Sequence, residues 1–165
     1  MIVVSGFTFE HGTSSIGGTV SLESYRSNIN TKPTTIFRIY PQLGYFFNDR
    51  ICLELLLAYE AVNYSNYDAK SSNLALGFGS KYYIKNFYGG AGILLQSFSN
   101  SYAPSTDNMD VDILKFVLIF EIGYLIPIIE DVYIDIGIDY FRGLGNYKEE
   151  SEIDLGAGIK IFFGK

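Results

Sequence analysis

The sequence predicts an all-β protein, a closed antiparallel up-and-down barrel of eight strands. In eight segments, apolar residues alternate with polar residues or glycines in steps of two. Successive side chains of a strand point to opposite faces, so this period predicts a sheet with two unlike surroundings. The connections alternate between short and long, and the strand number is even. This layout is typical of transmembrane barrels.

The apolar positions support each strand in turn. We expect strands at residues 16–25, 35–47, 50–61, 73–84, 86–97, 112–128, 131–141 and 152–163. Most are near the roughly 9–11 residues that a tilted strand needs to cross a bilayer. In chain order, the apolar face of the eight segments includes Ile16, Val20, Leu22; Phe37, Ile39, Leu43, Tyr45; Ile51, Leu53, Leu55, Leu57; Leu74, Leu76, Phe78, Tyr82; Phe87, Ala91, Ile93, Leu95; Leu114, Phe116, Leu118, Phe120, Ile122; Val132, Ile134, Ile136, Ile138; and Ile153, Leu155, Ala157, Ile159, Ile161, Phe163.

The connections divide the barrel into two unlike ends. Asn48-Asp49, Lys85-Asn86 and Glu130-Asp131 are tight polar turns at one end. Long loops rich in Asn, Ser, Asp and Tyr alternate with them, at residues 26–34, 62–72, 98–111 and 142–151. Both termini then lie at the short-turn end. One proline conflicts with this pattern, because Pro41 lies within a strand and cannot donate a ladder hydrogen bond. We expect a bulge or a missing pair there.

The volume available inside the barrel decides which face points outward. An eight-stranded barrel has an interior just wide enough for its side chains. The Leu, Ile, Phe and Tyr side chains of the apolar face would overfill it, whereas the other face carries glycines that leave room for larger neighbours. We therefore predict that the apolar face contacts lipid. The alternative is a soluble, lipocalin-like ligand-binding barrel with the faces reversed.

The inward face of such a membrane barrel carries a network of ionic and polar side chains. A buried ion must be paired or hydrogen-bonded, so we expect these residues to form a structural network that fills a packed polar lumen. They are Glu23, Arg38, Gln42, Glu54, Glu60, Lys81, Lys115, Glu121, Asp135, Asp139, Asp154 and Lys160. A continuous channel is not expected, because water-filled porins need about 16–18 strands. Aromatic residues near the strand ends predict girdles at the membrane interfaces.

Composition excludes several classes of protein. The net charge of −6 provides no basic surface for nucleic acid. The single cysteine, Cys52, cannot form an internal disulfide, and we expect it to be a small buried residue. We interpret residues 1–11 as an N-terminal segment, either a linker or a remnant of an upstream region, and residues 12–165 as the barrel domain. The apolar start, Met1 to Val4, lacks the basic region of a secretion signal, so we expect that a signal was removed or that the chain starts upstream.

Three stretches resemble the small eight-stranded outer-membrane barrels of Gram-negative bacteria, the OmpX-like and OmpA N-terminal-domain-like families. Residues 12–24 resemble the opening strand, and residues 40–59 resemble the first periplasmic hairpin. The end of the chain resembles the family's insertion signal, formed here by Asp154, Gly156, Ile159, Ile161 and Phe163, although Gly164 and Lys165 follow the aromatic residue. The resemblance implies an integral outer-membrane protein that is inserted by the barrel-assembly machinery.

Family members serve as adhesins, envelope tethers, serum-resistance factors or, rarely, lipid-modifying enzymes, so fold alone does not decide function. We predict a non-enzymatic monomer without cofactor or metal, whose long outer loops serve surface interaction, adhesion or envelope integrity. Adaptable contact residues in those loops support this, namely Asn63, Tyr64, Asn66, Tyr67 and Tyr102.

Catalytic and metal sites have weak support in the sequence. A lipid-modifying enzyme would have to use His11, the only histidine, with Ser14 or Ser15, and these lie at the wrong end of the barrel for that chemistry. Asp107, Asp110 and Asp112 lack the glycine and the terminal glutamate of a calcium loop. Gly77-Phe-Gly79 and Gly156-Ala-Gly158 lie inside strands and do not form phosphate loops.

Overall fold

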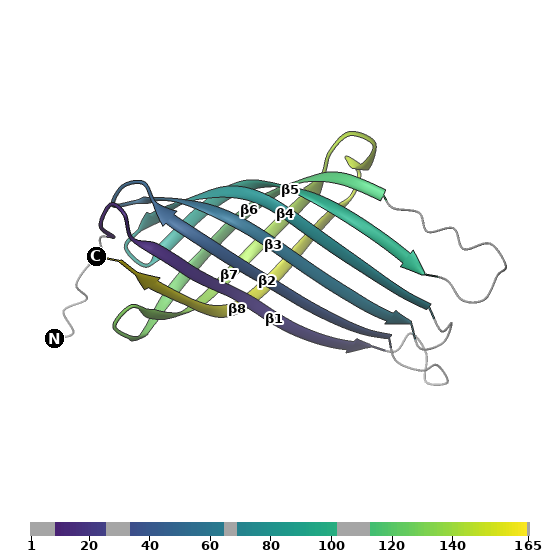
Figure 1. Ribbon diagram of the computed structural model, residues 1–165, viewed down its shortest axis with the longest axis horizontal. Helices are drawn as coiled ribbons and strands as arrows, with labels where there is room; N and C mark the ends of the chain where they lie inside the picture. Colours follow the sequence, from purple (N-terminus) through teal and green to yellow (C-terminus); the bar gives the residue numbers. More distant parts are fainter. Residues whose placement is uncertain (1–8, 26–33, 65–68, 102–112, 165) are drawn as a thin grey trace.

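Eight antiparallel strands form a closed barrel, so the predicted fold class is confirmed (Figure 1). The computed structural model describes residues 9–25, 34–64, 69–101 and 113–164, without the side chains of residues 23–25, 64, 69, 98–101 and 113. The strands are β1 (Ser14–Tyr25), β2 (Thr34–Phe46), β3 (Ile51–Tyr64), β4 (Ala69–Ile84), β5 (Phe87–Ser101), β6 (Ile113–Ile129), β7 (Val132–Gly143) and β8 (Ser151–Phe163). A short 3-10 helix, Gly145–Tyr147, lies between β7 and β8.

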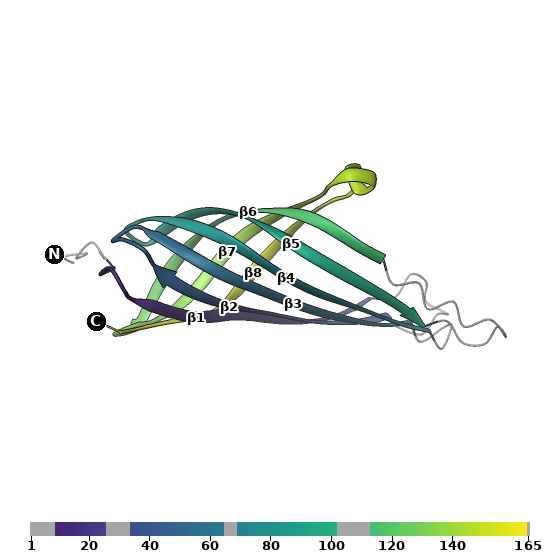
Figure 2. The same ribbon diagram turned by 45° about the horizontal axis from the view of Figure 1, so that its top comes forward.

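Each strand pairs with its neighbour in the chain, and β8 pairs with β1 to close the barrel. The three predicted tight turns lie together at one end, which we call the inner end (Figures 1 and 2). Phe9 and Gly164, the first and last described residues, lie there too. Two of the turns place a non-glycine residue in the left-handed region, Lys85 at φ 56° and Asp131 at φ 64°. The strand ends that flank the four longer connections lie at the opposite, outer end.

The strands extend further toward the outer end than the sequence predicts. The expected loop at residues 62–72 is strand at both of its ends, where Val62 pairs with Ser71 and Asn63 with Lys70. Likewise, β5 continues to Ser101. Beyond a membrane both faces of a strand meet water, so the alternation that marks a strand disappears while backbone pairing continues.

Prolines interrupt the ladder at two positions. At Pro41 the β2–β3 register continues, but no pairs form between Ile39↔Tyr59 and Gln42↔Leu56. The loss of pairing that we expected at this proline is therefore observed. On the other side, Pro41 pairs with Gly18, which has φ +150° and whose missing Cβ would collide with Pro41 Cα. The second irregularity was not predicted: the β6–β7 register shifts between Pro127 and Ile129, just before the turn.

The barrel exposes its apolar face and buries its charges. Leu155 is 79% exposed and Leu22 73%, whereas Glu54 is 3% and Lys160 1% exposed. This distribution contradicts the soluble alternative, which requires leucines inside and carboxylates in water. An exterior of Leu, Ile, Phe and Val suits the hydrocarbon of a bilayer. None of the described residues forms a helix that is long and apolar enough to span a membrane.

Candidate functional site

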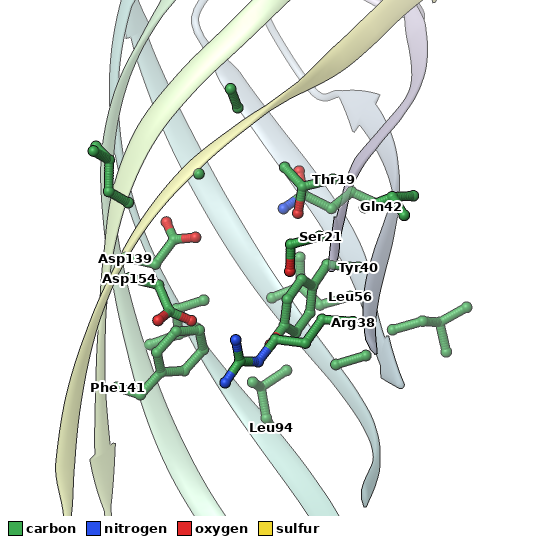
Figure 3. A pocket seen from close by; sticks show the side chains of 17 residues that line it. Thr19, Ser21, Arg38, Tyr40, Gln42, Leu56, Leu94, Asp139, Phe141 and Asp154 are labelled. Carbon is green, nitrogen blue, oxygen red and sulfur yellow. The ribbon is translucent and has the colours of Figure 1, made fainter. Parts of the chain in front are cut away.

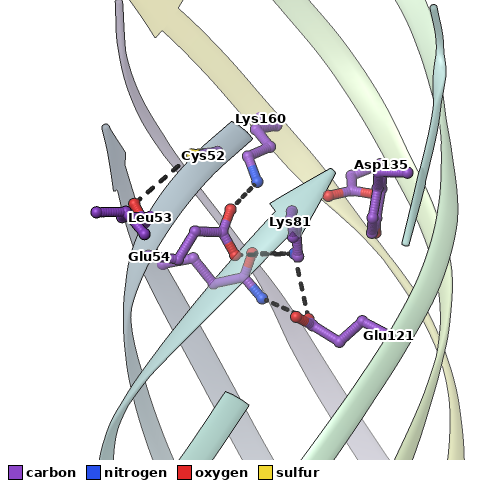
Figure 4. Close-up of polar contacts among 9 residues, drawn as sticks. Cys52, Leu53, Glu54, Lys81, Glu121, Asp135 and Lys160 are labelled. Atoms are coloured by element: carbon purple, nitrogen blue, oxygen red, sulfur yellow. Dashed lines mark hydrogen bonds and ion pairs between the residues drawn. The ribbon is translucent and has the colours of Figure 1, made fainter. Parts of the chain in front are cut away.

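A compact ionic cluster occupies the lumen in the inner half of the barrel (Figure 4). Lys160 Nζ donates to Glu54 Oε1 at 2.5 Å, and Lys81 Nζ lies 3.1 Å from Glu54 Oε2 and 3.2 Å from Glu121 Oε1. Gln42 accepts a hydrogen bond from Lys81 at 3.2 Å and donates to Glu121 at 3.5 Å. Two ammonium groups therefore balance two carboxylates in a site without solvent exposure, as buried ions require.

Glycines on neighbouring strands make room for the long side chains of this cluster. Glu54 pairs in register with Gly44 on one side and Gly79 on the other, and Gly90 lies beside Lys81. A Cβ at Gly90 would lie 2.8 Å from Lys81 Cγ. The glycines of the inward face therefore leave room for the ionic cluster inside a narrow barrel.

Tyr88 connects this cluster to β7. Its hydroxyl donates to Asp135 Oδ1 at 2.7 Å, and its ring lies 4.6 Å from Lys81 Nζ in a cation–π contact. The ring fits because Gly123, on the adjacent strand, leaves its side-chain space empty: a Cβ there would overlap the Tyr88 hydroxyl. Tyr88 thus contacts both Lys81 and Asp135, and the absence of a side chain at Gly123 makes room for its ring.

Aromatic side chains close the inner end of the lumen. This aromatic plug consists of Phe9, Phe46, Tyr83, Tyr88, Tyr133 and Phe162, which are all buried and pack with Cys52 and Leu125. Phe46, Tyr83, Tyr88, Tyr133 and Phe162 point into the lumen, so these aromatic residues near the strand ends do not belong to the expected interfacial girdle. Their neighbours Tyr45, Phe47, Tyr82, Phe87, Tyr124 and Phe163 point outward. Residues of opposite parity near a strand end cannot all face lipid.

Phe9 is the member of the plug that sequence reasoning missed. It precedes β1, yet its ring stacks on Phe46 at 4.3 Å between centroids and lies 4.5 Å from Phe162. The local sequence has no strand alternation around Phe9, so the only available signal is a large apolar residue just before the first strand.

The outer half of the lumen is hollow, which differs from the packed polar lumen that we expected. Two adjoining cavities of about 360 Å³ and 420 Å³ share Tyr40, Ala58, Leu94, Phe141 and Asp154 as lining residues. One wall is apolar and combines Leu56, Ala58, Ala75, Leu94, Val117 and Ile119 with Tyr40 and Phe141. Sequence reasoning missed this wall because Leu and Ala at inward positions fall outside the expected polar pattern.

Charged side chains line the same cavities. Arg38 Nε donates to Glu60 Oε2 at 2.6 Å, and Lys115 Nζ donates to Glu150 Oε2 at 2.8 Å near the outer rim. Figure 3 shows Asp139 and Asp154 on the wall facing Thr19, Ser21 and Arg38. The lumen thus has three layers: an aromatic plug, a neutral ionic cluster, and an amphipathic cavity toward the outer end.

The structure places the predicted network residues in separate groups. The ionic cluster contains Gln42, Glu54, Lys81, Glu121 and Lys160; Asp135 bonds to Tyr88; and Arg38, Glu60, Lys115, Asp139 and Asp154 line the outer cavities. The side chain of Glu23 lies outside the described residues. Of the proposed insertion signal, Ile159, Ile161 and Phe163 face outward, and Asp154 and Gly156 line the cavity.

The weaker candidates form no site among the described residues. His11 is exposed at the inner end, edge-on to Tyr45 and Phe47, and no described hydrogen bond joins it to Ser14 or Ser15. Cys52 is fully buried in the plug. Asp107, Asp110 and Asp112 lie outside the described residues, and the described part contains no group of three residues that could hold a metal ion.

Comparison with known proteins identifies the fold. No protein-family model matches the sequence, and neither does any curated protein. The structure is similar to the N-terminal β-barrel domain of Pseudomonas aeruginosa OprF, with a TM-score of 0.58 and 17% identity over 93% of this chain and 98% of that one. Neisserial surface protein A has a TM-score of 0.53 and 17% identity over 92% of this chain and 96% of that chain. The Yersinia pestis outer membrane protein Ail has a TM-score of 0.54 and 15% identity over 92% and 99%. This chain therefore has the fold of the small eight-stranded outer-membrane barrels.

Proposed function

We propose that this protein is a monomeric, non-enzymatic outer-membrane protein whose barrel is an anchor and whose outer loops interact with surfaces outside the cell. The observation that carries the proposal is the double closure of the inner lumen. An ionic cluster and an aromatic plug lie in series across it, so the barrel offers no route for transport through the membrane. Its contribution must then come from the exposed outer end.

Several features support the outer-membrane location. The exterior is apolar, the fold is shared with proteins described as outer-membrane or surface proteins, and the strands are long enough to cross a bilayer. The insertion signal of the last strand would be read by the barrel-assembly machinery. The three strand positions Ile159, Ile161 and Phe163 all face outward, where an assembly factor could contact them.

The outer loops are proposed to carry the contacts. Asn63 is exposed at the outer end of β3, and Tyr64 ends that strand. Asn66, Tyr67 and Tyr102 lie outside the described residues, so their part in the proposal rests on composition alone. Tyr and Asn combine large contact area with adaptable hydrogen bonding. The partners would be host or cell-surface ligands.

A loop-shortening series tests this proposal. Each outer loop is replaced in turn by a short Asn-Gly turn, and cells producing each variant are assayed for attachment and for resistance of the envelope to detergent. We expect at least one variant to lose attachment while it keeps the gel mobility shift between unboiled and boiled samples. A change in the inner turn at Asn48-Asp49 is the matched control. Full attachment and envelope integrity in every variant, and in a deletion strain, would contradict the proposal.

A further inference from the structure

The seam between β1 and β8 is open in its outer half. Six register pairs join the two strands, from Ser14↔Phe163 to Thr19↔Gly158. Beyond them, β1 continues to Tyr25 and β8 begins at Ser151, but no further pairs join these described segments. In Figure 2 the two strands diverge toward the outer end. All other seams are paired over at least eleven positions.

The open part of the seam lies at the depth of the membrane. Ser14 pairs with Tyr45 and Phe163, two outward aromatic residues at the inner end. Six residues with a rise of about 3.4 Å and a tilt of about 40° span roughly 15 Å along the barrel axis. The apolar band of such barrels is about 25 Å tall. The gap therefore opens within the hydrocarbon region and continues to its outer edge.

The rim of the gap carries the most exposed of the large apolar side chains described. Leu155, Leu22 and Ile153 are 79%, 73% and 70% exposed, which are the highest values among the large apolar side chains described. They flank the gap on both strands. Behind it lies the cavity of about 360 Å³, which is bordered by Val20, Ser21, Leu155, Gly156 and Ala157 of the same two strands. The gap thus connects lipid with the cavity.

The two outer cavities have an excess of acidic side chains. Six carboxylates line the two outer cavities, from Glu60, Asp139, Glu149, Glu150, Glu152 and Asp154, against two cationic groups, from Arg38 and Lys115. Four acidic side chains are therefore in excess. Asp139, Glu152 and Asp154 lie on β7 and β8, whereas Leu56, Leu94 and Ile119 of the apolar wall lie on β3, β5 and β6. A ligand that matches both surfaces must be cationic at one end and apolar at the other.

Asp139 is the carboxylate with the clearest need for a cation. It pairs in register with Glu121 on β6 and with Asp154 on β8, so three acids lie side by side across three strands. Like charges directly opposite one another destabilise a sheet. Lys81 compensates Glu121, whereas Asp139 forms no hydrogen bond or ion pair with any described residue. No group of three potential metal ligands occurs in the described part, which favours an organic cation.

From these observations we propose that the outer lumen binds a single-chain cationic amphiphile from the membrane. Its ammonium group lies beside Asp139 and Asp154, and its chain contacts the apolar wall and leaves through the gap between β1 and β8. The inference goes beyond the proposed loop function and does not depend on it, because loops can bind a surface whether or not the lumen is occupied.

The binding test uses decyltrimethylammonium as probe, with decanol and decanoate as neutral and anionic counterparts. The protein is held in zwitterionic nanodiscs, and the NMR signals of Leu94 and Ile119 methyl groups report on the cavity. We expect these signals to shift saturably with the cation and not with decanoate. Methyl groups of Leu76 and Leu118, which belong to the outward face, report partition into lipid. Equal effects of the cation, decanol and decanoate on the cavity methyl groups would overturn the proposal.

Variants connect the binding to the carboxylates. The double change Asp139→Asn and Asp154→Asn should weaken the cation about ten-fold or more, because two nearby charges are removed. Asp49→Asn removes one acid in the inner turn and should leave binding unchanged. Unaltered affinity in the double variant, with retained heat-modifiable migration, would overturn the assignment. If that variant does not fold, the comparison of the three probes on the unchanged protein still decides whether the cavity binds the cation selectively.

Cysteine pairs test the route. Both variants are made in a Cys52→Ala background. Ile16→Cys with Ile161→Cys replaces two residues that are paired in the seam. Val20→Cys with Ala157→Cys replaces two residues in the same register beyond the last pair, in the gap. We expect oxidation to cross-link the first pair and not the second. Bulky thiol reagents on the second pair should slow binding of decyltrimethylammonium added through donor vesicles. Equal cross-linking of both pairs, or an unchanged binding rate, would overturn the lateral route.

Discussion

Lys160 Nζ donates a 2.5 Å hydrogen bond to Glu54 Oε1 across the lumen, joining residues that are 106 positions apart in the chain. Both side chains are 1% exposed. The bond links β8 to β3 through the lumen, although these two strands are not paired with each other. Since the ionic cluster contains two ammonium groups and two carboxylates, the effect of a change depends on which partner it leaves unpaired.

Removing one ion of this pair should cost much more than removing both. Lys160→Met leaves Glu54 with Lys81 as its remaining cation, and we expect the free energy of unfolding to fall by about 3–5 kcal/mol. The measurement is urea unfolding in micelles, followed by circular dichroism because the chain has no tryptophan. The double variant with Glu54→Gln is the control and should recover most of that loss. A double variant as unstable as Lys160→Met would contradict the pairing argument.

Gly123 should tolerate a side chain poorly. A Cβ there overlaps the Tyr88 hydroxyl and ring, so Gly123→Ala must displace the phenol from Asp135. We expect a loss of about 1–3 kcal/mol from the unpaired carboxylate and the disturbed packing. Gly156→Ala is the matched control, because its Cβ meets only Thr19 Cγ2 at 3.6 Å. Equal stability of the two variants in urea would show that Tyr88 repacks without cost.

Phe9 should contribute to barrel stability although it precedes the first strand. Phe9→Ala leaves a void among the Phe46, Tyr83 and Phe162 rings, and buried Phe→Ala changes cost about 3–5 kcal/mol. The midpoint of thermal unfolding on unboiled gels gives the readout. Phe47→Ala is the control, since Phe47 is 61% exposed at the same end. If Phe9→Ala unfolds at the same midpoint temperature as the unchanged protein, the Phe9 ring does not stabilise the plug.

A charge on the exterior should disturb insertion according to its depth. Phe78 is 66% exposed in β4, and Phe78→Arg should cost roughly 2–4 kcal/mol if it lies near the midplane. Phe78→Leu keeps an apolar contact with lipid and should fold normally. Folding yield into vesicles measures the effect. Efficient folding of the arginine variant would place this face away from hydrocarbon.

The period of two was enough to predict the strands, their antiparallel order and the outward face. It reflects a strong physical contrast, because Leu155 meets lipid while its neighbour Asp154 lines the lumen. The tight turns were equally clear, since polar pairs such as Lys85-Asn86 interrupt the alternation. Strand ends toward the outer side were not predictable, because backbone pairing continues beyond the clear apolar alternation, as where Asn63 pairs with Lys70.

The layers of the lumen were harder to predict than its residues. The charged residues lie on alternate positions, but which of them meet depends on strand stagger around the barrel, which a linear pattern does not contain. Glu54 and Lys160 could be assigned to one face, yet not to one another. The inward apolar residues, such as Leu94 and Val117, look like interruptions of the polar pattern and become a wall only when four strands are brought together.

The short seam between β1 and β8 has a consequence for how the molecule comes apart. These are the first and last strands, so their junction can form only after the whole barrel sequence is present, and it rests on six pairs. Structures open first where local stability is lowest. Unzipping under force or denaturant should therefore begin at the outer edge of this junction, and slow amide hydrogen exchange should be found furthest from it, around β4 and β5.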